Sequence, residues 1–441
     1  MKIAVVGAGM AGLTAAFRLA GAHDVEVFES AANAGGNVRT QRLDGYVFEW
    51  GPNGFLSNAA ELARLVAAAG LQGDVVPASA AASKRYVYSG GRLHALPSKP
   101  QQALTTTLIP PAAKLRALSE VLQRPPASQR DGESVHAFFA RHFGELVADR
   151  VVAPALLGIT GGDARSTSAR ALFPRLYAME AAKGSLIRAF AGAGRTPARL
   201  QSFGPDGMQR LPDAIAQRLG ERVHLASPVE RVERSAAGWT VVTGSVPVRA
   251  DAVVLATPAY AAATLCEPLD ATLAAALRRI AYAPMRVCGI AYRAADVPAP
   301  LDGFGFLAAR GQGVRLLGAL YTSTIFPAHA PPGVAYLRVF LGGSADAEAV
   351  RLDAAAARAI VERDLATTLG IAAAPLVYHE RVWPQAIPQY ALDHLATLAE
   401  IDRRVAAFPG LALAGNAYRG PGLSDAAVAG VAAAQALTAE R

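Results

Sequence analysis

The first hydrophobic segment of the chain is KIAVVG at positions 2–7, a short run of small and β-branched residues. A run without polar alternation predicts a parallel strand that is buried on both faces. Apolar residues at helical spacing follow in AGLTAAFRLA, and this helix is expected to stop near Gly21, because glycine suits the turn after a helix. VEVFE predicts a second strand that ends at Glu29. This order of elements predicts a βαβ unit at the start of the chain.

The hydrophobic pattern of the remaining chain predicts one helical region and further strands. Residues 99–200 are expected to be mainly helical, because ESVHAFFARHFGELVADRVVAPAL and the proline-bracketed IPPAAKLRALSEVLQRPP carry apolar residues at helical spacing. Residues 261–407 alternate strand-like segments, such as RLLGALYTS and AYLRVFLGG, with one long helix that ends at Gly370. We therefore expect an α/β fold of mixed α+β character. The expected domains are a Rossmann-like nucleotide-binding domain (1–84, 201–260 and 408–441), a mixed-sheet substrate domain (85–98 and 261–407) and an inserted helical domain (99–200).

Composition narrows the class of protein. The 441 residues are 52% hydrophobic and 18% charged, which is typical of a well-buried globular enzyme of two or three domains and excludes a disordered chain. The net charge is +8, but no block rich in lysine and arginine indicates nucleic-acid binding. Cys266 and Cys288 form no CxxC pair, so we expect neither disulfides nor zinc, in a reducing compartment. No apolar run reaches the ~18 residues of a membrane span, and the N-terminal stretch is not a secretory signal, because it contains glycine-rich turn residues.

Three glycines form the pattern G-x-G-x-x-G between the first strand and its helix: Gly7, Gly9 and Gly12. The first permits a tight turn, the second lets the backbone approach a pyrophosphate, and the third lets the helix pack against the strand. The N-terminus of the helix offers unpaired N–H groups to the phosphates. Glu29, 17 residues after Gly12, stands where a carboxylate accepts hydrogen bonds from both ribose hydroxyls. The segment therefore predicts a dinucleotide site.

Two further glycine-rich segments decide between a dinucleotide that visits, such as NAD, and one that stays bound. AGGNVRT contains the pair Gly35–Gly36 and, close by, Arg39, whose guanidinium can reach a phosphate or a carboxylate. Near the C-terminus LALAGNAYRGPGLSDAAVAG predicts a strand, a glycine-rich turn and a helix, with Ser424 as N-cap and Asp425 in the first turn. The N-terminus of that helix can stabilise negative charge on a reduced flavin.

Together, these features resemble the flavin amine oxidase superfamily. The resemblance implies FAD, held between both ends of the chain, and no second G-x-G-x-x-G indicates a site for NAD. It also implies that Val229 contributes backbone contacts to adenine. The residues that we expect around the cofactor are Gly7, Gly9, Met10, Ala11, Gly12, Glu29, Ser30, Gly35, Gly36, Asn37, Arg39, Gly51, Pro52, Asn53, Val229, Thr257, Gly415, Gly422, Leu423 and Ser424.

More specific stretches resemble the oxygen-dependent protoporphyrinogen oxidases. They are KRYVYSGGRLHALPSKP, GITGGDARSTSARALFPRLYAMEAAKGSLIRA, FGPDGMQRLPDAI, LGALYTSTIFP and RVWPQAIPQYALDH. This resemblance implies oxidation of protoporphyrinogen IX to protoporphyrin IX in haem biosynthesis, with three O2 giving three H2O2. No side chain is then expected to act as a catalytic group, because flavin N5 carries the chemistry and the protein orients the substrate.

The implied substrate is a largely apolar macrocycle with propionate arms, which calls for an apolar chamber with a few cationic anchors. We expect Arg85 to be such an anchor, with Arg39 as the alternative. Asn53, Phe304, Phe306 and Leu320 are expected to line the chamber; the alternatives are a turn residue for Asn53 and plain core packing for the three apolar strand residues.

Histidine chemistry is not expected at this site. His394 is interpreted as structural rather than as a base. His136 and His142, six residues apart on a helix, face different directions, so we expect no metal site.

Several alternatives stay open at this point. The substrate can be coproporphyrinogen III, the reaction can be amine oxidation or desaturation, and the chain can be a flavoprotein that only binds tetrapyrroles. A cytoplasmic location, peripheral contact with the inner face of the cell membrane and a homodimer are each compatible with the sequence. The basic residues Lys114, Arg116 and Arg124 either face an anionic membrane or form a solvated surface.

Overall fold

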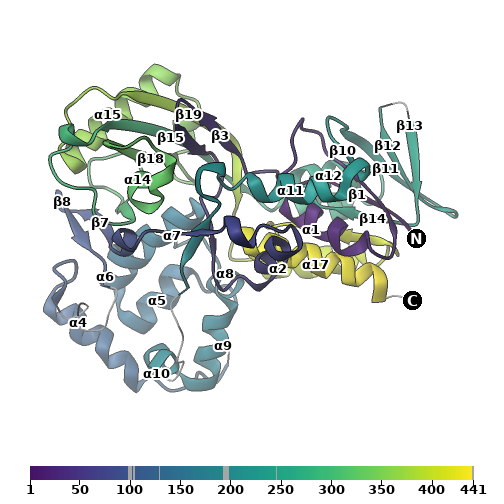
Figure 1. Ribbon diagram of the computed structural model, residues 1–441. Coiled ribbons are helices and arrows are strands. Elements are labelled where there is room, and N and C mark those ends of the chain that lie inside the picture. Colours follow the sequence, from purple (N-terminus) through teal and green to yellow (C-terminus); the bar gives the residue numbers. More distant parts are fainter. Residues whose placement is uncertain (98–101, 103–104, 129, 192–197, 245, 440–441) are drawn as a thin grey trace.

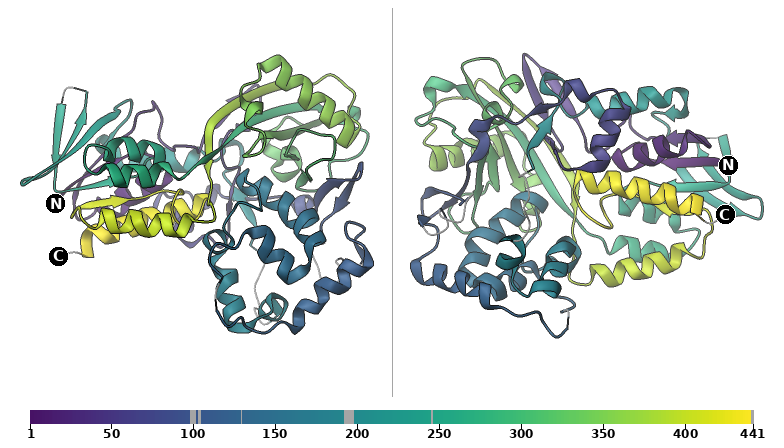
Figure 2. Two further views of the ribbon diagram at one scale, coloured as in Figure 1. Left: turned by 180° about the vertical axis from the view of Figure 1, so that it is seen from behind. Right: turned by 60° about the horizontal axis from the view of Figure 1, so that its bottom comes forward.

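The computed structural model describes residues 1–97, 102, 105–128, 130–191, 198–244 and 246–439. Two halves, each built on a sheet, lie side by side, and a group of helices packs beneath one of them (Figure 1). Both termini lie at the far end of the half that contains the parallel sheet (Figure 2). Within the described residues, no helix combines the length and the apolar character that a membrane span requires.

The first half contains a five-stranded parallel sheet in the order β10-β2-β1-β14-β20. Its strands are β1 (Lys2–Val6), β2 (Asp24–Phe28), β10 (Val223–His224), β14 (Ala252–Leu255) and β20 (Leu411–Leu413). The helices that flank it are α1 (Met10–Leu19), α2 (Ala60–Ala68), α11 (Arg210–Leu219), α12 (Ala259–Cys266), α13 (Ala271–Arg278), α16 (His394–Val405) and α17 (Leu423–Ala439). An antiparallel sheet of β11 (Val229–Ser235), β12 (Gly238–Thr243) and β13 (Val246–Ala250) extends from it.

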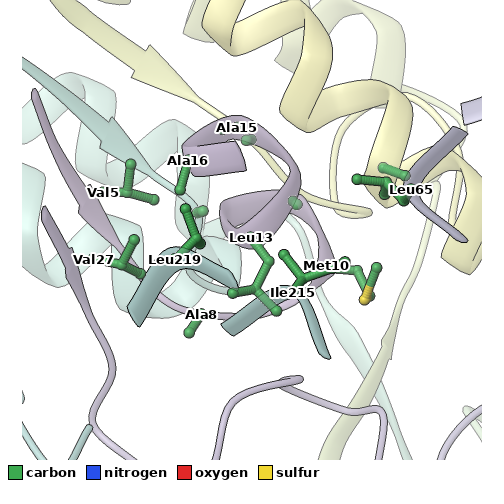
Figure 3. Close-up of a cluster of buried hydrophobic side chains, with 14 of the residues drawn as sticks. Val5, Ala8, Met10, Leu13, Ala15, Ala16, Val27, Leu65, Ile215 and Leu219 are labelled. Atoms are coloured by element: carbon green, nitrogen blue, oxygen red, sulfur yellow. The ribbon is translucent and has the colours of Figure 1, made fainter. Parts of the chain in front are cut away.

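Alternation along β1 places its side chains in two separate cores. Ile3 and Val5 pack with α1, α2, α11 and α17, whereas Ala4 and Val6 pack with α12, α13 and α16. Figure 3 shows part of the first core, which contains Val5 of β1, Leu13 of α1 and Ile215 of α11. The continuous hydrophobic run at the start of the chain follows from this burial on both faces.

The second half contains a seven-stranded mixed sheet in the order β19-β15-β18-β17-β16-β7-β8. Its strands are β7 (Arg85–Ser89), β8 (Arg92–Ala95), β15 (Tyr282–Arg293), β16 (Gly305–Ala308), β17 (Gly318–Leu320), β18 (Val334–Gly342) and β19 (Val377–Pro388). Helix α15 (Ala354–Leu369) covers one face through the core cluster that contains Val361 and Leu365. Shorter elements near this half are β3 (Thr40–Leu43), β4 (Tyr46–Glu49), β5 (Phe55–Leu56), β6 (Val76–Pro77), β9 (Leu200–Ser202) and α14 (Thr322–Ile325).

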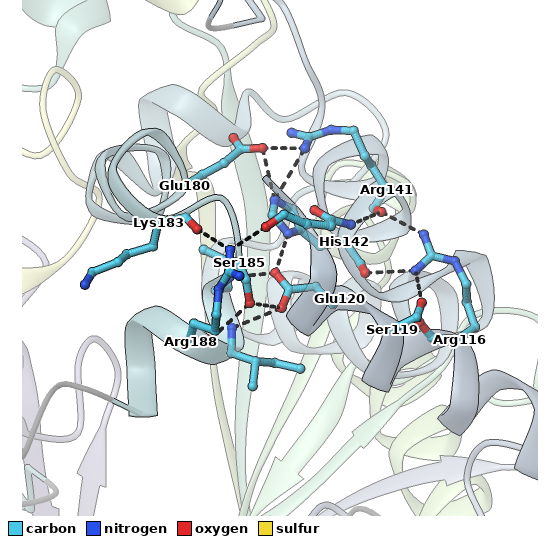
Figure 4. A network of polar contacts seen from close by, with 12 residues as sticks. Arg116, Ser119, Glu120, Arg141, His142, Glu180, Lys183, Ser185 and Arg188 are labelled. Carbon is cyan, nitrogen blue, oxygen red and sulfur yellow. Dashed lines mark hydrogen bonds and ion pairs between the residues drawn. The ribbon is translucent and has the colours of Figure 1, made fainter. Parts of the chain in front are cut away.

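The helical group comprises α4 (Pro111–Leu118), α5 (Val135–Phe143), α6 (Glu145–Val147), α7 (Ala153–Thr160), α8 (Ala169–Leu172), α9 (Pro174–Lys183) and α10 (Leu186–Ala191). A buried charged network ties several of these helices together (Figure 4). Glu120 accepts hydrogen bonds from the hydroxyl of Ser185 and from the N–H groups of Leu186 and Ile187, and it lies 2.8 Å from Nδ1 of His142. One fully buried carboxylate therefore accepts hydrogen bonds from N–H groups at the start of α10 that have no acceptor within the helix, and it fixes α10 against α5.

The α/β fold of mixed α+β character is confirmed. The prediction that α15 ends at Gly370 is confirmed as well, since that residue adopts a left-handed φ of 70°. The expectation of a single long helix in residues 261–407 was wrong, because α13 and α16 also lie there. RLLGALYTS is not one strand: neither neighbouring strand pairs with the chain beyond Leu320, and Thr322 begins α14. The division into three domains stays a prediction.

Candidate cofactor and substrate cavity

A cavity of about 490 Å³ lies between the two sheets. Its wall combines the turn before α1, the turn before α17, the ends of β15 and β19, and one face of β16, β17 and β18. Elements from both ends of the chain and from its middle therefore meet at one hollow. Its size falls in the range of small-molecule sites.

The glycine turn before α1 is shaped by two different demands. A Cβ on Gly12 would lie 1.9 Å from the carbonyl oxygen of Gly7, so the fold itself requires glycine there. A Cβ on Gly9 would meet only the Cα of Gly36, at 3.9 Å, so the protein leaves room beside Gly9. This room opens at the N-terminus of α1, where backbone N–H groups favour an anion. The turn therefore fits a pyrophosphate that approaches the backbone at Gly9.

A second helix N-terminus borders the same cavity. Helix α17 begins at Leu423, so the prediction that Ser424 is its N-cap was wrong. Asp425 instead accepts a hydrogen bond from the N–H of Gly422, the residue before the helix, as the third residue of a capping box does. Helix α17 packs closely on α1, because a Cβ on Gly430 would lie 2.2 Å from the carbonyl oxygen of Ala11. Two helix dipoles thus place positive partial charge at one cavity.

Glu29 and Arg39 organise the loops around the turn. The carboxylate of Glu29 accepts hydrogen bonds from the N–H groups of Ala8 and Ala31, at 2.7 and 2.9 Å. The guanidinium of Arg39 donates to the carbonyl oxygens of Ala34 and Asn33, and burial lowers its pKa. Arg39 therefore braces the loop that contains the glycine pair. Glu29 lies directly after β2, at the edge where a ribose would approach.

The structure brings most of the predicted cofactor residues together. Those that line the cavity are Gly9, Met10, Ala11, Gly35, Gly36, Asn37, Gly51, Pro52, Asn53, Thr257, Gly415, Gly422 and Leu423. Those outside its wall are Gly7, Gly12, Glu29, Ser30, Arg39, Val229 and Ser424. Val229 begins β11, and the segment before it contacts Glu29, since the N–H of Ser227 donates to its carbonyl oxygen.

The substrate-side predictions divide in the same way. Phe304 and Leu320 line the cavity, and both pack against the core cluster that contains Ile325 and Phe326. Phe306 also borders the cavity, but its side chain packs in the core cluster that contains Cys288 and Val339. Arg85 is exposed and stands outside the wall, with its guanidinium 4.9 Å from the centre of the Phe304 ring. Arg85 therefore contacts the chamber through Phe304.

Two charged residues near the cavity escaped the sequence analysis. Arg338, on β18, lines the cavity and donates to the carbonyl oxygen of Gly51. Burial lowers the pKa of its guanidinium to about 10. Glu49 ends β4 behind this wall, and burial raises the pKa of its carboxyl to about 7, although the N–H of Met208 donates to it. Both lie in ordinary strand patterns, VFE and LRV, so no local signal in the sequence sets them apart.

The histidines named from the sequence lie outside the cavity wall. His394 stacks on Tyr390 and contacts the carbonyl oxygen of Tyr418 through Nε2, which is a structural role. His136 and His142 belong to separate clusters. His136 lies with Glu145 and Asp149 at a spacing that could hold a metal ion, but Arg165 also pairs with Asp149. The absence of a metal site stays a prediction.

The residues of the cavity fit a dinucleotide. The room beside Gly9 accepts a pyrophosphate, the carboxylate of Glu29 faces the loop that a ribose would reach, and the hydroxyl oxygen of Thr257 is buried without a partner among the described residues. A ligand that enters along the two helix N-termini would satisfy these groups. The part of the cavity wall that includes Phe304, Leu320 and Phe340 is apolar.

Comparisons with known proteins point to one group. The chain matches the family described as flavin containing amine oxidoreductase over residues 10–438. It is 34% identical to a chloroplastic protoporphyrinogen oxidase of Oryza sativa subsp. japonica, over 95% of this chain and 84% of that protein. It is 31% identical to the protoporphyrinogen oxidase of Homo sapiens, over 98% of this chain and 97% of that protein. The fold resembles a crystal structure from Exiguobacterium sp. 255-15 that bears the provisional name protoporphyrinogen oxidase, with a TM-score of 0.85, 24% identity, and coverage of 100% and 99%.

Proposed function

This chain belongs to the protoporphyrinogen oxidase family within the flavin containing amine oxidoreductases, and we propose that it oxidises protoporphyrinogen IX to protoporphyrin IX. It is an FAD-dependent oxidoreductase. We propose further that three molecules of O2 accept the electrons in turn and leave as three molecules of H2O2. The observation that carries the proposal is a cavity that combines two helix N-termini and a glycine turn with an apolar wall.

The chain's own residues hold and polarise the cofactor. The turn around Gly9 and the N-terminus of α1 would hold the pyrophosphate, and Glu29 would hold the ribose. The N-terminus of α17, at Gly422 and Leu423, would stabilise negative charge on the reduced ring. FAD, when bound, supplies the two-electron acceptor that the side chains lack. No protein side chain is needed as a base, which agrees with the apolar character of the wall.

The apolar wall orients the substrate and keeps water away from it. Phe304, Leu320 and Phe340 contribute from three neighbouring parts of the seven-stranded sheet. A macrocycle with hydrocarbon edges gains free energy from leaving water for such a wall, at roughly 25 cal/mol per Å² of buried apolar surface. Its carboxylates need cations, and we propose that Arg85 binds one of them at the exposed side of Phe304. Arg85→Ala should raise KM much more than it lowers kcat, because it removes binding that ground state and transition state share.

Turnover under air tests the proposed function. The purified holoenzyme is mixed separately with protoporphyrinogen IX, coproporphyrinogen III and a primary amine, and porphyrin fluorescence and peroxide are followed together. We expect the fastest turnover with protoporphyrinogen IX and no peroxide from the amine. Faster turnover of coproporphyrinogen III would replace the substrate. A holoenzyme that binds porphyrin but oxidises none of the three would mean a binding protein.

We also propose that the segment 111–124 rests on an anionic membrane surface. Leu115 and Leu122 are 70% and 77% exposed, and Leu118, between them in the sequence, is exposed as well. The one carboxylate of the segment, Glu120, is buried, so the exposed charges are basic. Exposed leucines beside basic residues are typical of helices that lie in a membrane interface.

Sedimentation with vesicles tests this contact. The enzyme should sediment with vesicles that contain phosphatidylglycerol and less with neutral vesicles. Leu115→Glu/Leu122→Glu should stay in the supernatant while it keeps its turnover in detergent. Equal sedimentation of this variant and the parent would refute the contact.

A further inference from the structure

Arg338 is the one charged side chain among the described residues that line the cavity. It is 5% exposed, and the wall around it consists of apolar residues, glycines and a few amides and hydroxyls. A guanidinium in such a wall loses most of its hydration, which is costly unless an anion compensates it. The question is which anion does so.

The protein supplies little compensation. One terminal nitrogen of Arg338 donates to the carbonyl oxygen of Gly51, and the guanidinium lies 5.0 Å from the centre of the Phe340 ring. Its Nε is buried and has no hydrogen-bond partner within the part of the chain that the structure describes. The structure records no ion pair of Arg338 with a described carboxylate; the carboxylate that acts on it, Glu49, is turned toward Met208 and Thr40, which donate to it.

Strand register relates Arg338 to Arg85. Arg338 pairs with Leu320, Leu320 pairs with Gly305, and Gly305 pairs with Arg85. These four residues form one row across β18, β17, β16 and β7, and paired residues in neighbouring strands point to the same face. Three strand spacings of about 4.8 Å place the two arginines about 14 Å apart at their Cα atoms.

The next row confirms which face this is. Tyr86, Phe306, Ala319 and Val339 pair in the same way, and they pack in or against the core on the α15 side. The row of Arg85 and Arg338 therefore faces away from α15, toward the cavity that Leu320 lines. Gly305 and Leu320 form a floor without charge between a buried arginine and an exposed one.

We propose that Arg338 is the inner carboxylate anchor of the substrate site and that, with Arg85 at the outer end of the row, it binds two carboxylates of one apolar ligand. This proposal rests on the proposed function, since it names how a porphyrinogen's propionates are held.

The test compares protoporphyrin IX, a diacid, with its dimethyl ester, which has the same body without charges. Affinities of the holoenzyme for both are measured by porphyrin fluorescence anisotropy in detergent, together with FAD content. Arg338→Met should weaken the diacid about 10- to 100-fold, the loss expected for a charge-assisted hydrogen-bonded pair, and leave the ester unchanged. Arg338→Lys should recover part of the preference for the diacid, because it restores the charge without the planar fork.

Arg85→Met serves as a second variant that leaves Arg338 in place. It should retain a preference for the diacid over the ester, and this measurement stands even if Arg338→Met does not fold. Equal losses for diacid and ester in Arg338→Met, an unchanged diacid affinity, or a change in FAD affinity alone would overturn the proposal. If Arg338→Met turns over a porphyrinogen as the parent enzyme does, only the role of Arg338 as an anchor is refuted. If the parent enzyme turns over no porphyrinogen, the proposed function itself is refuted.

Discussion

Replacing single glycines of the turn before α1 separates the demands of the fold from those of the cofactor. Gly9→Ala adds a methyl group where the nearest protein atom lies 3.9 Å away. Gly9 has a φ of −68°, which alanine adopts readily. Gly12→Ala adds the same methyl group 1.9 Å from the carbonyl oxygen of Gly7. The first variant should therefore disturb cofactor binding alone, and the second should disturb the fold.

The expected magnitudes follow from this geometry. In the apoprotein, Gly9→Ala should stabilise the fold by about 0.4–1 kcal/mol, because alanine restricts the unfolded chain. It should destabilise the fold by about the same amount, because alanine is a poorer N-cap than glycine. The free energy of unfolding should therefore stay within ~0.5 kcal/mol of the parent. In the holoenzyme the methyl group separates the backbone N–H groups from the pyrophosphate. Weakening two charge-assisted hydrogen bonds should cost about 3 kcal/mol, or roughly 100-fold in the Kd of FAD. Gly12→Ala forces α1 away from β1 and should destabilise the apoprotein by about 3 kcal/mol or more.

Two measurements on each variant check these values. The FAD is removed with potassium bromide, and urea unfolding of the apoprotein gives its stability. FAD is then titrated back, and the quenching of flavin fluorescence gives the Kd. Gly21→Ala is the matched control, because no atom lies within 4 Å of its added methyl group and it is remote from the cavity.

Two outcomes would refute the reasoning. If Gly9→Ala binds FAD as tightly as the parent, the room beside Gly9 is not where the pyrophosphate lies. If the apoprotein of Gly9→Ala is as unstable as that of Gly12→Ala, the turn does not separate the two demands.

Three further predictions concern buried groups. Folding raises the pKa of Glu49 from 4.5 to about 7, so the native state binds more protons than the unfolded state between these two pH values, and the free energy of unfolding should fall by about 3 kcal/mol as pH rises through this window. Urea unfolding from pH 4.5 to 8 measures this fall, and Glu49→Gln should remove most of it. The same pH dependence in Glu49→Gln and in the parent would contradict the prediction. Burial raises the thiol pKa of Cys266 and Cys288 to about 12, so neither thiol should react with iodoacetamide at pH 8 until urea unfolds the chain. Mass spectrometry measures the labelling. Labelled cysteines in the native protein would contradict the prediction. Glu120→Ala leaves His142 and two backbone N–H donors without their acceptor, so it should destabilise the helical group by about 3–5 kcal/mol in urea unfolding. The control Glu221→Ala, on the surface, should change the free energy of unfolding by less than ~0.5 kcal/mol. Equal effects of the two variants would refute the role of the buried network.

The sequence predicted what depends on neighbouring residues. The strand, turn and helix around Gly7, Gly9 and Gly12 follow from local hydrophobicity and from the backbone freedom of glycine, and the structure has these elements where the sequence predicted them. The end of α15 at Gly370 is local in the same sense. At the start of α17, the residue types alone did not identify the capping side chain, because both Ser424 and Asp425 suit a helix start. The hydrogen bond from the N–H of Gly422 shows that the side chain is that of Asp425.

The tertiary structure decided what depends on contacts between distant segments. Arg85 and Arg338 lie in the same row only because β7, β16, β17 and β18 pair in that order and register. Glu49 holds its proton near neutral pH only because other segments bury it. The sequence by itself determined a dinucleotide site and its family, because turns and helix ends are encoded within a few residues. The environment of a charge is set by everything that excludes water from it, and those atoms come from the whole chain.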